Sequence, residues 1–306
     1  WEVDTKKIYA RLLDILHEEN IKLDESMKKH TSFRVGGVAD ILVKPRNEEE
    51  IIDVINLFKK ENIPYLVMGN GSNMLVKDGG IRGVVIKISD SFNYFEINEN
   101  QVVANSGAML SIIGKAVLKS DLKGFEFASG IPGTLGGAIT MNAGAYGGEM
   151  KDIIESVRVI DENGEILELE NEEMKFSYRN SIVKEKNYIV LSAKINLQKG
   201  DYDEIKSTMD EMTKKRVNNQ PLNLPSGGST FKRPEGYIAA KLIQDANLKG
   251  LTLRGAQVSE KHSGFIVNTG EATAKDIINL IDIVKNIVKL KFNVELEEEI
   301  KIVGED

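Results

Sequence analysis

Two glycine-rich segments are the strongest signs of chemistry in this sequence. The first is Gly69-Asn70-Gly71-Ser72-Asn73, which directly follows an apolar run, and the second spans residues 129–149 with seven glycines between Gly130 and Gly148. Because glycine has no Cβ atom, the backbone N–H groups of such segments can approach and point at a phosphate. Together they predict a site for a phosphorylated cofactor, and the alternative is that they only form tight turns.

The first segment does not fit the common nucleotide fingerprints. Its pattern Gly69-x-Gly71-x-x-Met74 lacks the third glycine of the dinucleotide motif, and Leu75-Val76 and a glycine pair follow where that motif would begin a helix. A P-loop motif is also missing. A Rossmann site is therefore disfavoured.

A hydroxyl group lies beside glycines and cations in the loop 225–234. Ser229 follows the pair Gly227-Gly228 and precedes Lys232 and Arg233, a setting that can bind an anion and position a proton donor. A turn serine is the alternative. Neither a Gly-x-Ser-x-Gly elbow nor a Ser-His-Asp motif surrounds Ser229, so nucleophilic hydrolysis is not supported.

Two further charged residues could contact a substrate. Arg179, in Tyr178-Arg179-Asn180-Ser181, follows an acidic stretch and precedes an apolar run, where it could pair with a carboxylate or a flavin oxygen. Glu299 lies in a segment, 294–303, whose alternation predicts a strand with Glu297 and Glu299 on one face. The alternatives are a surface arginine and a solvated strand edge.

Hydrophobic periodicity and capping signals predict the elements that position these residues. Helices are expected at 5–19, 47–63 with Asn47 as the cap, 110–119, 202–217, 237–246 and 272–292 with Thr273 as the cap. Strands are expected at 65–68, 83–88 and 294–303, and a hairpin at 157–169 around an Asn-Gly pair. The segment 129–149 and residues 220–228 are expected to be loops.

The length of 306 residues predicts two or three compact units, and the pattern of elements along the chain places three domains at 1–85, 86–205 and 206–306. The net charge of -7 argues against a broad nucleic-acid interface, and no apolar stretch approaches the roughly 18 to 20 residues that span a bilayer. The chain has no cysteine, and its three histidines lie far apart, so no metal site is expected. We expect a cytoplasmic protein that binds no nucleic acid and does not insert into a membrane.

In this order, these segments resemble the UDP-N-acetylenolpyruvoylglucosamine reductase family from about His30 to Gly304. The resemblance rests on the joint occurrence of motifs at residues 30–37, 69–73, 129–134, 142–147, 178–179, 228–232 and 296–299. It implies an α+β fold of the vanillyl-alcohol-oxidase type, also called PCMH-like. In that fold two N-terminal α/β subdomains hold FAD non-covalently and a C-terminal α+β domain binds the substrate.

The resemblance also implies the activity. NADPH reduces FAD and leaves, and UDP-N-acetylglucosamine enolpyruvate then enters the same cleft and is reduced to UDP-N-acetylmuramate, a peptidoglycan precursor. Carried over residue by residue, the catalytic arginine is Arg179, the proton-donating serine is Ser229, and the catalytic carboxyl group is Glu299. A monomer is favoured as the oligomeric state. The cofactor-binding residues implied are Arg34, Gly36, Gly69, Asn70, Gly71, Ser72, Asn73, Ser129, Gly130, Ile131, Pro132, Gly133, Thr134, Gly137, Asn142 and Gly144.

The chain resembles the shorter type II branch of the family, because the sequence between Ser181 and Tyr188 leaves no room for the substrate-covering tyrosine loop of type I. Substrate closure must therefore use other residues. Lys232 is expected to contact a phosphate or carboxylate. The remaining substrate-binding residues expected are Tyr178, Arg216, Gln220, Tyr237, Gln257, Lys261 and His262.

Two other functions fit parts of this pattern. A flavin enzyme of the same fold that oxidises alcohols or sugars would need a substrate-activating base and often a covalent flavin link, for which His30 is the only histidine near a cofactor segment. The other function is that of a nucleotide-binding module that has kept the fold but lost its catalytic activity. The joint presence of Arg179, Ser229 and Glu299 argues against such a loss.

Overall fold

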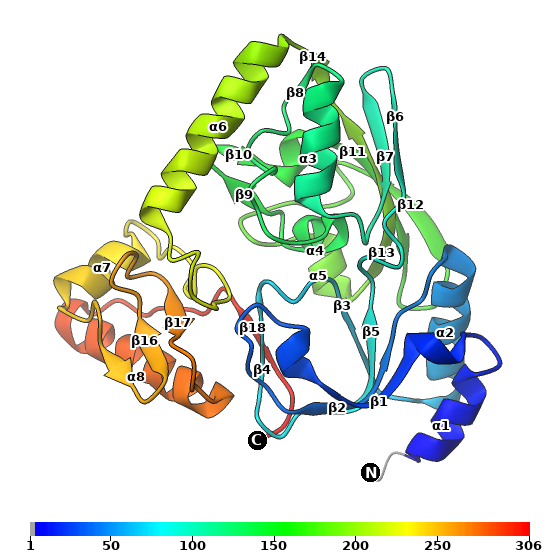
Figure 1. Ribbon diagram of the computed structural model, residues 1–306, viewed down its shortest axis with the longest axis horizontal. Helices are drawn as coiled ribbons and strands as arrows, with labels where there is room; N and C mark the ends of the chain where they lie inside the picture. Colours follow the sequence, from blue (N-terminus) through cyan, green and yellow to red (C-terminus); the bar gives the residue numbers. More distant parts are fainter. Residues whose placement is uncertain (1–3) are drawn as a thin grey trace. The chain divides into compact units, whose positions relative to one another are not determined.

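The computed structural model describes residues 4–306, which form two compact units. The first unit contains the described residues up to Lys22, together with Ile41–Asn70 and Val84–Arg216. The second contains Leu23–Asp40, Gly71–Gly83 and Val217–Asp306. Figure 1 follows the chain through both. The second unit thus combines two N-terminal segments with the C-terminal part of the chain.

The chain begins with a helix that is shorter than predicted. Helix α1 spans Thr5–Leu12, and a 3-10 turn, η1 (Glu18–Asn20), leads into strand β1 (Ile21–Ser26). The predicted helix over 5–19 is therefore wrong beyond Leu12. Leu16 is nevertheless buried in the same hydrophobic cluster as Leu12. A single turn after the helix brings it there, so the apolar spacing did not require a continuous helix.

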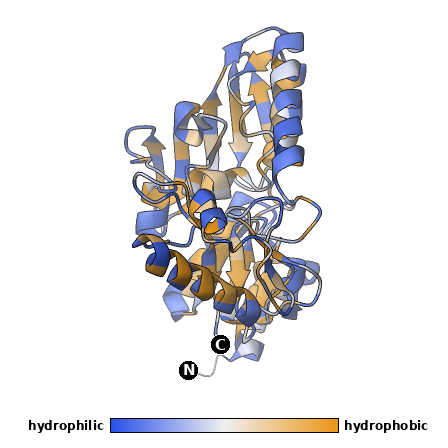
Figure 2. Ribbon diagram, turned by 90° about the vertical axis from the view of Figure 1, so that its left-hand side faces the viewer, coloured by the Kyte–Doolittle hydropathy of each residue, from blue (hydrophilic) through white to orange (hydrophobic). Residues whose placement is uncertain are grey.

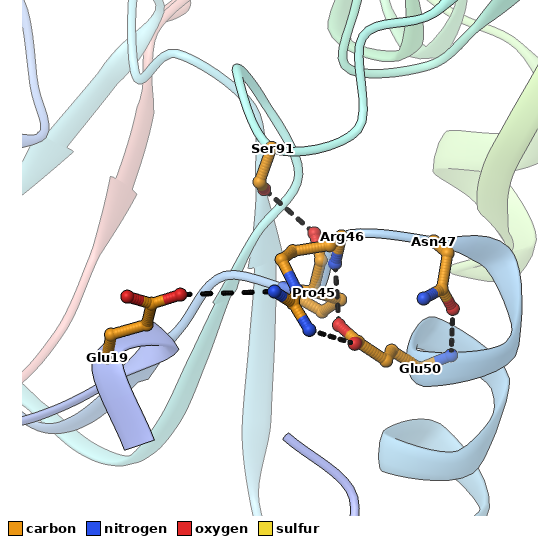
Figure 3. Close-up of polar contacts among 6 residues, drawn as sticks. All are labelled: Glu19, Pro45, Arg46, Asn47, Glu50 and Ser91. Carbon is orange, nitrogen blue, oxygen red and sulfur yellow. Dashed lines mark hydrogen bonds and ion pairs between the residues drawn. The ribbon is translucent and has the colours of Figure 1, made fainter. Parts of the chain in front are cut away.

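Helix α2 (Glu48–Glu61) begins where its cap was predicted. Asn47 Oδ1 accepts the N–H of Glu50 at 2.8 Å, and Glu50 Oε2 accepts the N–H of Arg46 at 2.7 Å (Figure 3). The predicted stripe of Ile51, Val54, Ile55 and Phe58 is fully buried, which confirms it.

A four-stranded sheet has the order β1-β2-β5-β3, with β2 at Val38–Val43, β3 at Tyr65–Met68 and β5 at Ile81–Lys87. Strands β3 and β5 run parallel, with Met68 opposite Lys87. The predictions of both strands are confirmed, although β3 is only partly buried. The first glycine segment begins directly after β3, at the carboxyl end of that strand.

The remainder of the first unit is built on a five-stranded antiparallel sheet of order β12-β11-β13-β7-β6. These strands are β6 (Phe95–Asn98), β7 (Gln101–Asn105), β11 (Ile154–Ile160), β12 (Ile166–Glu170) and β13 (Ile189–Asn196). The predicted hairpin is confirmed, since Ile160 pairs with Ile166 and the carboxylate of Asp161 accepts two backbone N–H groups inside the turn. Helix α3 (Leu110–Lys119) has the predicted bounds.

The second glycine segment is not the continuous loop that was predicted. It contains helix α4 (Leu135–Thr140) and the short strands β9 (Gly144–Ala145) and β10 (Gly148–Glu149). Thr134 caps α4, and Leu135, Ala138 and Ile139 are buried along one face. The sequence did not predict this helix, because glycine has a low helix propensity and the apolar face has only three residues.

The first unit ends with a long charged helix, α6 (Tyr202–Asn219), whose last three residues belong to the second unit. Its prediction is confirmed, and Ile205 is its one buried residue. The other elements of the first unit are β8 (Leu122–Lys123), η3 (Met150–Asp152), α5 (Ile182–Lys186) and β14 (Gln198–Lys199).

In the second unit, helix α8 (Ala274–Phe292) packs with a small antiparallel sheet of order β15-β16-β17. Thr273 and Asp276 form a reciprocal capping box, so the predicted cap is confirmed. The other elements are η2 (Met27–Lys29), β4 (Met74–Val76), α7 (Ala239–Asp245), β15 (Thr252–Leu253), β16 (Ala256–Val258), β17 (Ile266–Asn268) and β18 (Lys301–Val303).

The predicted strand at 294–303 is mostly wrong. Only Lys301–Val303 forms a strand, β18, which pairs in parallel with β4. The preceding residues instead make one antiparallel bridge, between Phe231 and Glu298. Leu296 and Ile300 are buried, but the acidic residues between them do not alternate regularly between buried and exposed.

Within residues 4–306, three hydrophobic clusters form the cores. Two belong to the first unit, one around α2 and the β3–β5 pair and one under the five-stranded sheet. The third belongs to the second unit and combines Phe33, Val35 and Leu75 with residues of α7 and α8. Figure 2 shows hydrophobic residues, in orange, and hydrophilic residues, in blue, within the same helices and strands. The three-domain division at 85 and 205 stays a prediction.

The cap of α2 can be tested by substitution. We expect Asn47→Ala to lower the free energy of unfolding by about 1 kcal/mol, because the N–H of Glu50 loses its acceptor. Asn47→Ser, which keeps an acceptor at this position, should cost only a few tenths of a kcal/mol. Chemical denaturation of the three proteins measures this, and equal stability of both variants would contradict the capping role.

Candidate functional site

The two glycine segments contact each other within the first unit. A Cβ atom at Gly69 would lie 2.3 Å from the side-chain oxygen of Thr134, so only glycine permits this approach. Thr134 is buried and its hydroxyl also accepts the N–H of Gly137 at 3.4 Å. The start of the first loop and the turn before α4 therefore form one structure.

Backbone N–H groups in these two loops have no acceptor on the protein. Within residues 4–306, this holds for the N–H groups of Gly69, Asn70, Ser129, Gly130, Gly133 and Thr134. Adjacent backbone donors of this kind bind phosphate oxygens. The loops therefore fit the pyrophosphate of a dinucleotide such as FAD, with Ile131 and Pro132 between the donors.

The other predicted cofactor residues near the N-terminus come together in the second unit. Ser32 donates its N–H to the carbonyl of Gly71 at 3.2 Å, and a Cβ atom at Gly36 would lie 2.8 Å from the carbonyl oxygen of Val76. Arg34 has a positive φ of 56°. For a residue with a side chain this conformation costs about 1 kcal/mol, and such strain is concentrated at functional sites.

The side chain of Asn142, which was predicted to bind the cofactor, makes hydrogen bonds within the first unit. Its side chain is fully buried, donates to Glu149 Oε2 and to the carbonyl of Ser177, both at 3.0 Å, and accepts the N–H of Lys151 at 3.0 Å. We therefore infer that Asn142 fixes the end of the glycine segment against the turn that carries Arg179.

Arg179 occupies a strained turn. Ser177 and Asn180 exchange two backbone hydrogen bonds of 3.1 Å, which leaves Tyr178 and Arg179 as the central residues. Arg179 has a φ of 53°, in the left-handed region where glycine or asparagine is usual. Its guanidinium group donates to the carbonyl of Gly144 at 3.3 Å and lies 5.0 Å from the Tyr178 ring centroid. The turn thus orients an arginine beside the glycine segment.

The segments that contain Ser229 and Glu299 pair with each other within the second unit. Thr230 accepts the N–H of Glu299 at 2.8 Å, and the next residues form the bridge between Phe231 and Glu298. Ser229 precedes Thr230, follows Gly228 with its φ of 79°, and is partly exposed. Within residues 4–306 its hydroxyl has no hydrogen-bond partner, so it is available to a ligand.

The two glutamates before Glu299 are each paired with a lysine. Glu297 lies 2.9 Å from Lys232, which lowers the pKa of the Glu297 carboxyl and keeps it ionised, and Glu298 lies 2.7 Å from Lys285. Lys232, expected to bind substrate, is therefore engaged by Glu297. The backbone pairing brings Glu299 opposite Thr230, the residue after Ser229, and Glu297 opposite Lys232.

Arg216, on α6, lies against the glycine segment of the first unit. Its Nε atom would be 3.2 Å from a Cβ atom at Gly130, and its guanidinium group interacts with the Tyr146 hydroxyl. Burial lowers the pKa of Arg216, which nevertheless stays charged at neutral pH. Tyr146 was not predicted as a site residue, and its φ of 53° is a signal that only the structure provides.

The other predicted substrate residues belong to the second unit. Gln257 and Lys261 line a shallow hollow of about 570 Å³, and Lys261 donates to the carbonyl of Val217. The Tyr237 side chain is exposed and Gln220 is partly exposed. His262 packs edge-to-face on Phe265 with 4.9 Å between ring centroids, and its Nδ1 accepts the N–H of Gly264.

Within residues 4–306, no cluster of three or more histidine, aspartate or glutamate side chains could hold a metal ion. None of the helices in the same part of the chain is long and apolar enough to cross a membrane.

The chain matches two family models. A model of FAD binding domains matches residues 39–170, and a model of the C-terminal domain of UDP-N-acetylenolpyruvoylglucosamine reductase matches residues 220–303. The first match contains both glycine segments. The second contains Ser229 and Glu299.

Full-length relatives are similar to the whole chain. UDP-N-acetylenolpyruvoylglucosamine reductase of Clostridioides difficile (strain 630) is 63% identical over 304 residues, which are 99% of this chain and 100% of the relative. The enzyme of the same name from Caldanaerobacter subterraneus subsp. tengcongensis is 56% identical over 295 residues, which are 96% of this chain and 97% of the relative.

Solved structures support the fold. The crystal structure of UDP-N-acetylenolpyruvylglucosamine reductase (MurB) from Thermus caldophilus matches with a TM-score of 0.78 and 33% identity, covering 92% of this chain and 97% of that one. A glucose oxidase variant of Phl p 4 matches with a TM-score of 0.50 and 14% identity over 70% of this chain and 50% of its own, and shares only the fold. The predicted α+β fold with an FAD-binding part is confirmed.

The environment of His262 predicts a pH effect on stability. Burial lowers the pKa of His262 below its ordinary 6.5, so the unfolded chain takes up the proton first as the pH falls. This contribution to the free energy of unfolding is complete above pH 6.5 and is lost as the pH falls toward the lowered pKa. In urea titrations between neutral and mildly acidic pH, the free energy of unfolding of His262→Gln should fall less with decreasing pH than that of the wild type. The exposed His17→Gln is the control, and equal pH profiles for wild type and His262→Gln would contradict this prediction.

Proposed function

Because the chain belongs to the UDP-N-acetylenolpyruvoylglucosamine reductase family, we propose that it reduces UDP-N-acetylglucosamine enolpyruvate to UDP-N-acetylmuramate, using FAD and NADPH. The product is a precursor of peptidoglycan. The observation that carries the proposal is the backbone pairing of Thr230, which directly follows Ser229, with Glu299, inside the part of the chain that matches the family's C-terminal domain.

Residues of both glycine segments would hold the cofactor. The backbone donors from Gly69 to Asn70 and from Ser129 to Thr134 would bind its pyrophosphate. When bound, FAD supplies to the substrate the hydride that it receives from NADPH.

Arg179 would stabilise negative charge on the substrate. Hydride addition to the terminal carbon of the enolpyruvyl double bond leaves negative charge on the neighbouring carbon, shared with the carboxylate. A fixed guanidinium group near that carboxylate lowers the energy of the charged species. The strained turn supports this role, because a preset arginine loses less freedom when the substrate binds.

Ser229 would supply the proton. Its hydroxyl, with no partner in residues 4–306, would donate to the carbon next to the substrate carboxylate, which completes the saturated lactyl ether. Glu299 would assist from the paired segment by polarising this proton donor. Serine is a weak acid, so the charges around Ser229 must favour proton release at the moment when the carbanion forms.

Other features agree with this reading. Between the turn at Arg179 and strand β13, the chain contains only the short helix α5, which supports closure over the substrate by other residues, as in the type II branch. We assign Arg216, Gln257, Lys261 and His262 to substrate binding. His30, which a covalent flavin link could use, is buried with its Nε2 atom 2.9 Å from Glu25, which supports a non-covalent cofactor.

We also propose that the protein acts as a monomer in the cytoplasm. The absence of cysteine, and of a helix able to cross a membrane in residues 4–306, supports this location.

The activity can be tested by an anaerobic absorbance trace of the FAD-loaded protein. NADPH should bleach the flavin band near ~450 nm, and UDP-N-acetylglucosamine enolpyruvate should then restore it without oxygen. Bleaching without recovery would contradict the substrate assignment, and failure to take up FAD would contradict the proposed function as a whole.

The same trace tests the proton donor. Ser229→Ala should leave bleaching by NADPH nearly unchanged and slow the recovery with substrate by about 10² to 10⁴-fold, the usual contribution of a positioned acid. Ser226→Ala, three residues earlier in the same loop, is the matched control and should behave as wild type. Equal damage to both half-reactions by Ser229→Ala would instead indicate a structural role.

A further inference from the structure

We propose that Asn73, at the end of the first glycine loop, is a positioning residue for Glu299. The Nδ2 atom of Asn73 donates to the backbone carbonyl of Glu299 at 3.1 Å, across 226 residues of sequence. The cofactor role expected of Asn73 from the sequence does not include this contact. The role given to Glu299 rests on the proposed function, whereas the contact itself does not.

The backbone of Glu299 is held on both sides. Its N–H group donates to Thr230 at 2.8 Å, and its carbonyl accepts from Asn73. The carbonyl of Asn73 in turn accepts the N–H of Lys301 at 2.9 Å, so Asn73 bonds to this segment through its side chain and its backbone. With both peptide groups fixed, the Glu299 side chain can vary only through its own rotamers.

This arrangement requires an asparagine. A side-chain donor is needed because the partner is a carbonyl oxygen, so aspartate at this position would face it with a second acceptor. The amide of Asn73 uses one N–H group in this contact, and no other hydrogen bond of the side chain occurs within residues 4–306. Its second N–H and its oxygen can therefore serve a cofactor at the same time.

The contact links two parts of the proposed site. Asn73 ends the loop that begins at Gly69, whose backbone donors fit a pyrophosphate, and the parallel pair of β4 and β18 begins directly after it. Binding of a dinucleotide to this loop would fix Asn73 and, through it, the carbonyl of Glu299. Binding of the cofactor would then also position the carboxylate of Glu299.

Amide hydrogen exchange tests the contact without any reaction. In FAD-loaded protein, Asn73→Asp should speed exchange in the segment 297–303 by about 3-fold or more, because local opening becomes easier when a fixing hydrogen bond is lost. Asn100→Asp is the matched control, since Asn100 Nδ2 also donates to a backbone carbonyl, that of Leu197 at 3.1 Å. Unchanged exchange in 297–303 for Asn73→Asp would overturn the proposal, whatever the substrate.

The half-reactions test the consequence for the reaction. At full FAD occupancy, Asn73→Asp should slow the limiting rate of reoxidation by substrate about 10-fold or more, with a much smaller effect on bleaching by NADPH. Asn100→Asp should leave both rates unchanged. A variant that only loses affinity for FAD, with a normal reoxidation rate once loaded, would overturn the positioning role. A wild-type protein that substrate fails to reoxidise would instead count against the proposed function.

Discussion

The proposed site depends on a short antiparallel pairing between residues 230–232 and 297–299. Thr230 is its centre. It is fully buried, its hydroxyl accepts the N–H of Ile266, its N–H donates to Gly264, and its carbonyl accepts the N–H of Glu299. Every polar group of Thr230 is therefore satisfied inside the second unit, as a buried position requires. Because Ser229 directly precedes Thr230, this fixed residue holds the backbone of Ser229 close to the segment that contains Glu299.

Some of the residues with left-handed backbone conformations lie in segments of the proposed site. Arg34 and Arg179, two cations assigned to the site, both have left-handed backbone conformations, and so does Tyr146 in the second glycine segment. Each costs about 1 kcal/mol that the surrounding hydrogen bonds must offset. For Arg179 these include the two bonds between Ser177 and Asn180. Glycine would relieve the strain but could not supply the charge.

Local signals in the sequence predicted much of the fold. The caps Asn47 and Thr273 marked the starts of α2 and α8, because a cap bonds to residues within three positions of itself. Helix α4 was missed because its glycines obscure a short apolar face. The strand at 294–300 was wrong because its pairing with residue 231 is a contact between distant parts of the chain, which periodicity cannot reveal.

In the candidate site, too, the contacts between distant parts of the chain could not be predicted from the sequence. Family resemblance predicted Arg179, Ser229 and Glu299, but neither resemblance nor spacing indicated that Thr230 and Asn73 bond to the backbone of Glu299. The involvement of segments 23–40 and 71–83 in the second unit was also not predictable, because it depends on long-range packing of Phe33 and Leu75 with α8.

The most direct test of this account compares two adjacent carboxylates. The pairing sets Glu299 opposite Thr230, the residue after Ser229, whereas Glu297 lies opposite Lys232 and forms an ion pair with it. Reoxidation of the reduced protein by UDP-N-acetylglucosamine enolpyruvate should therefore be about 10² to 10⁴-fold slower in Glu299→Gln, and within about 3-fold of wild type in Glu297→Gln. The reverse order, or equal effects of the two substitutions, would contradict the account.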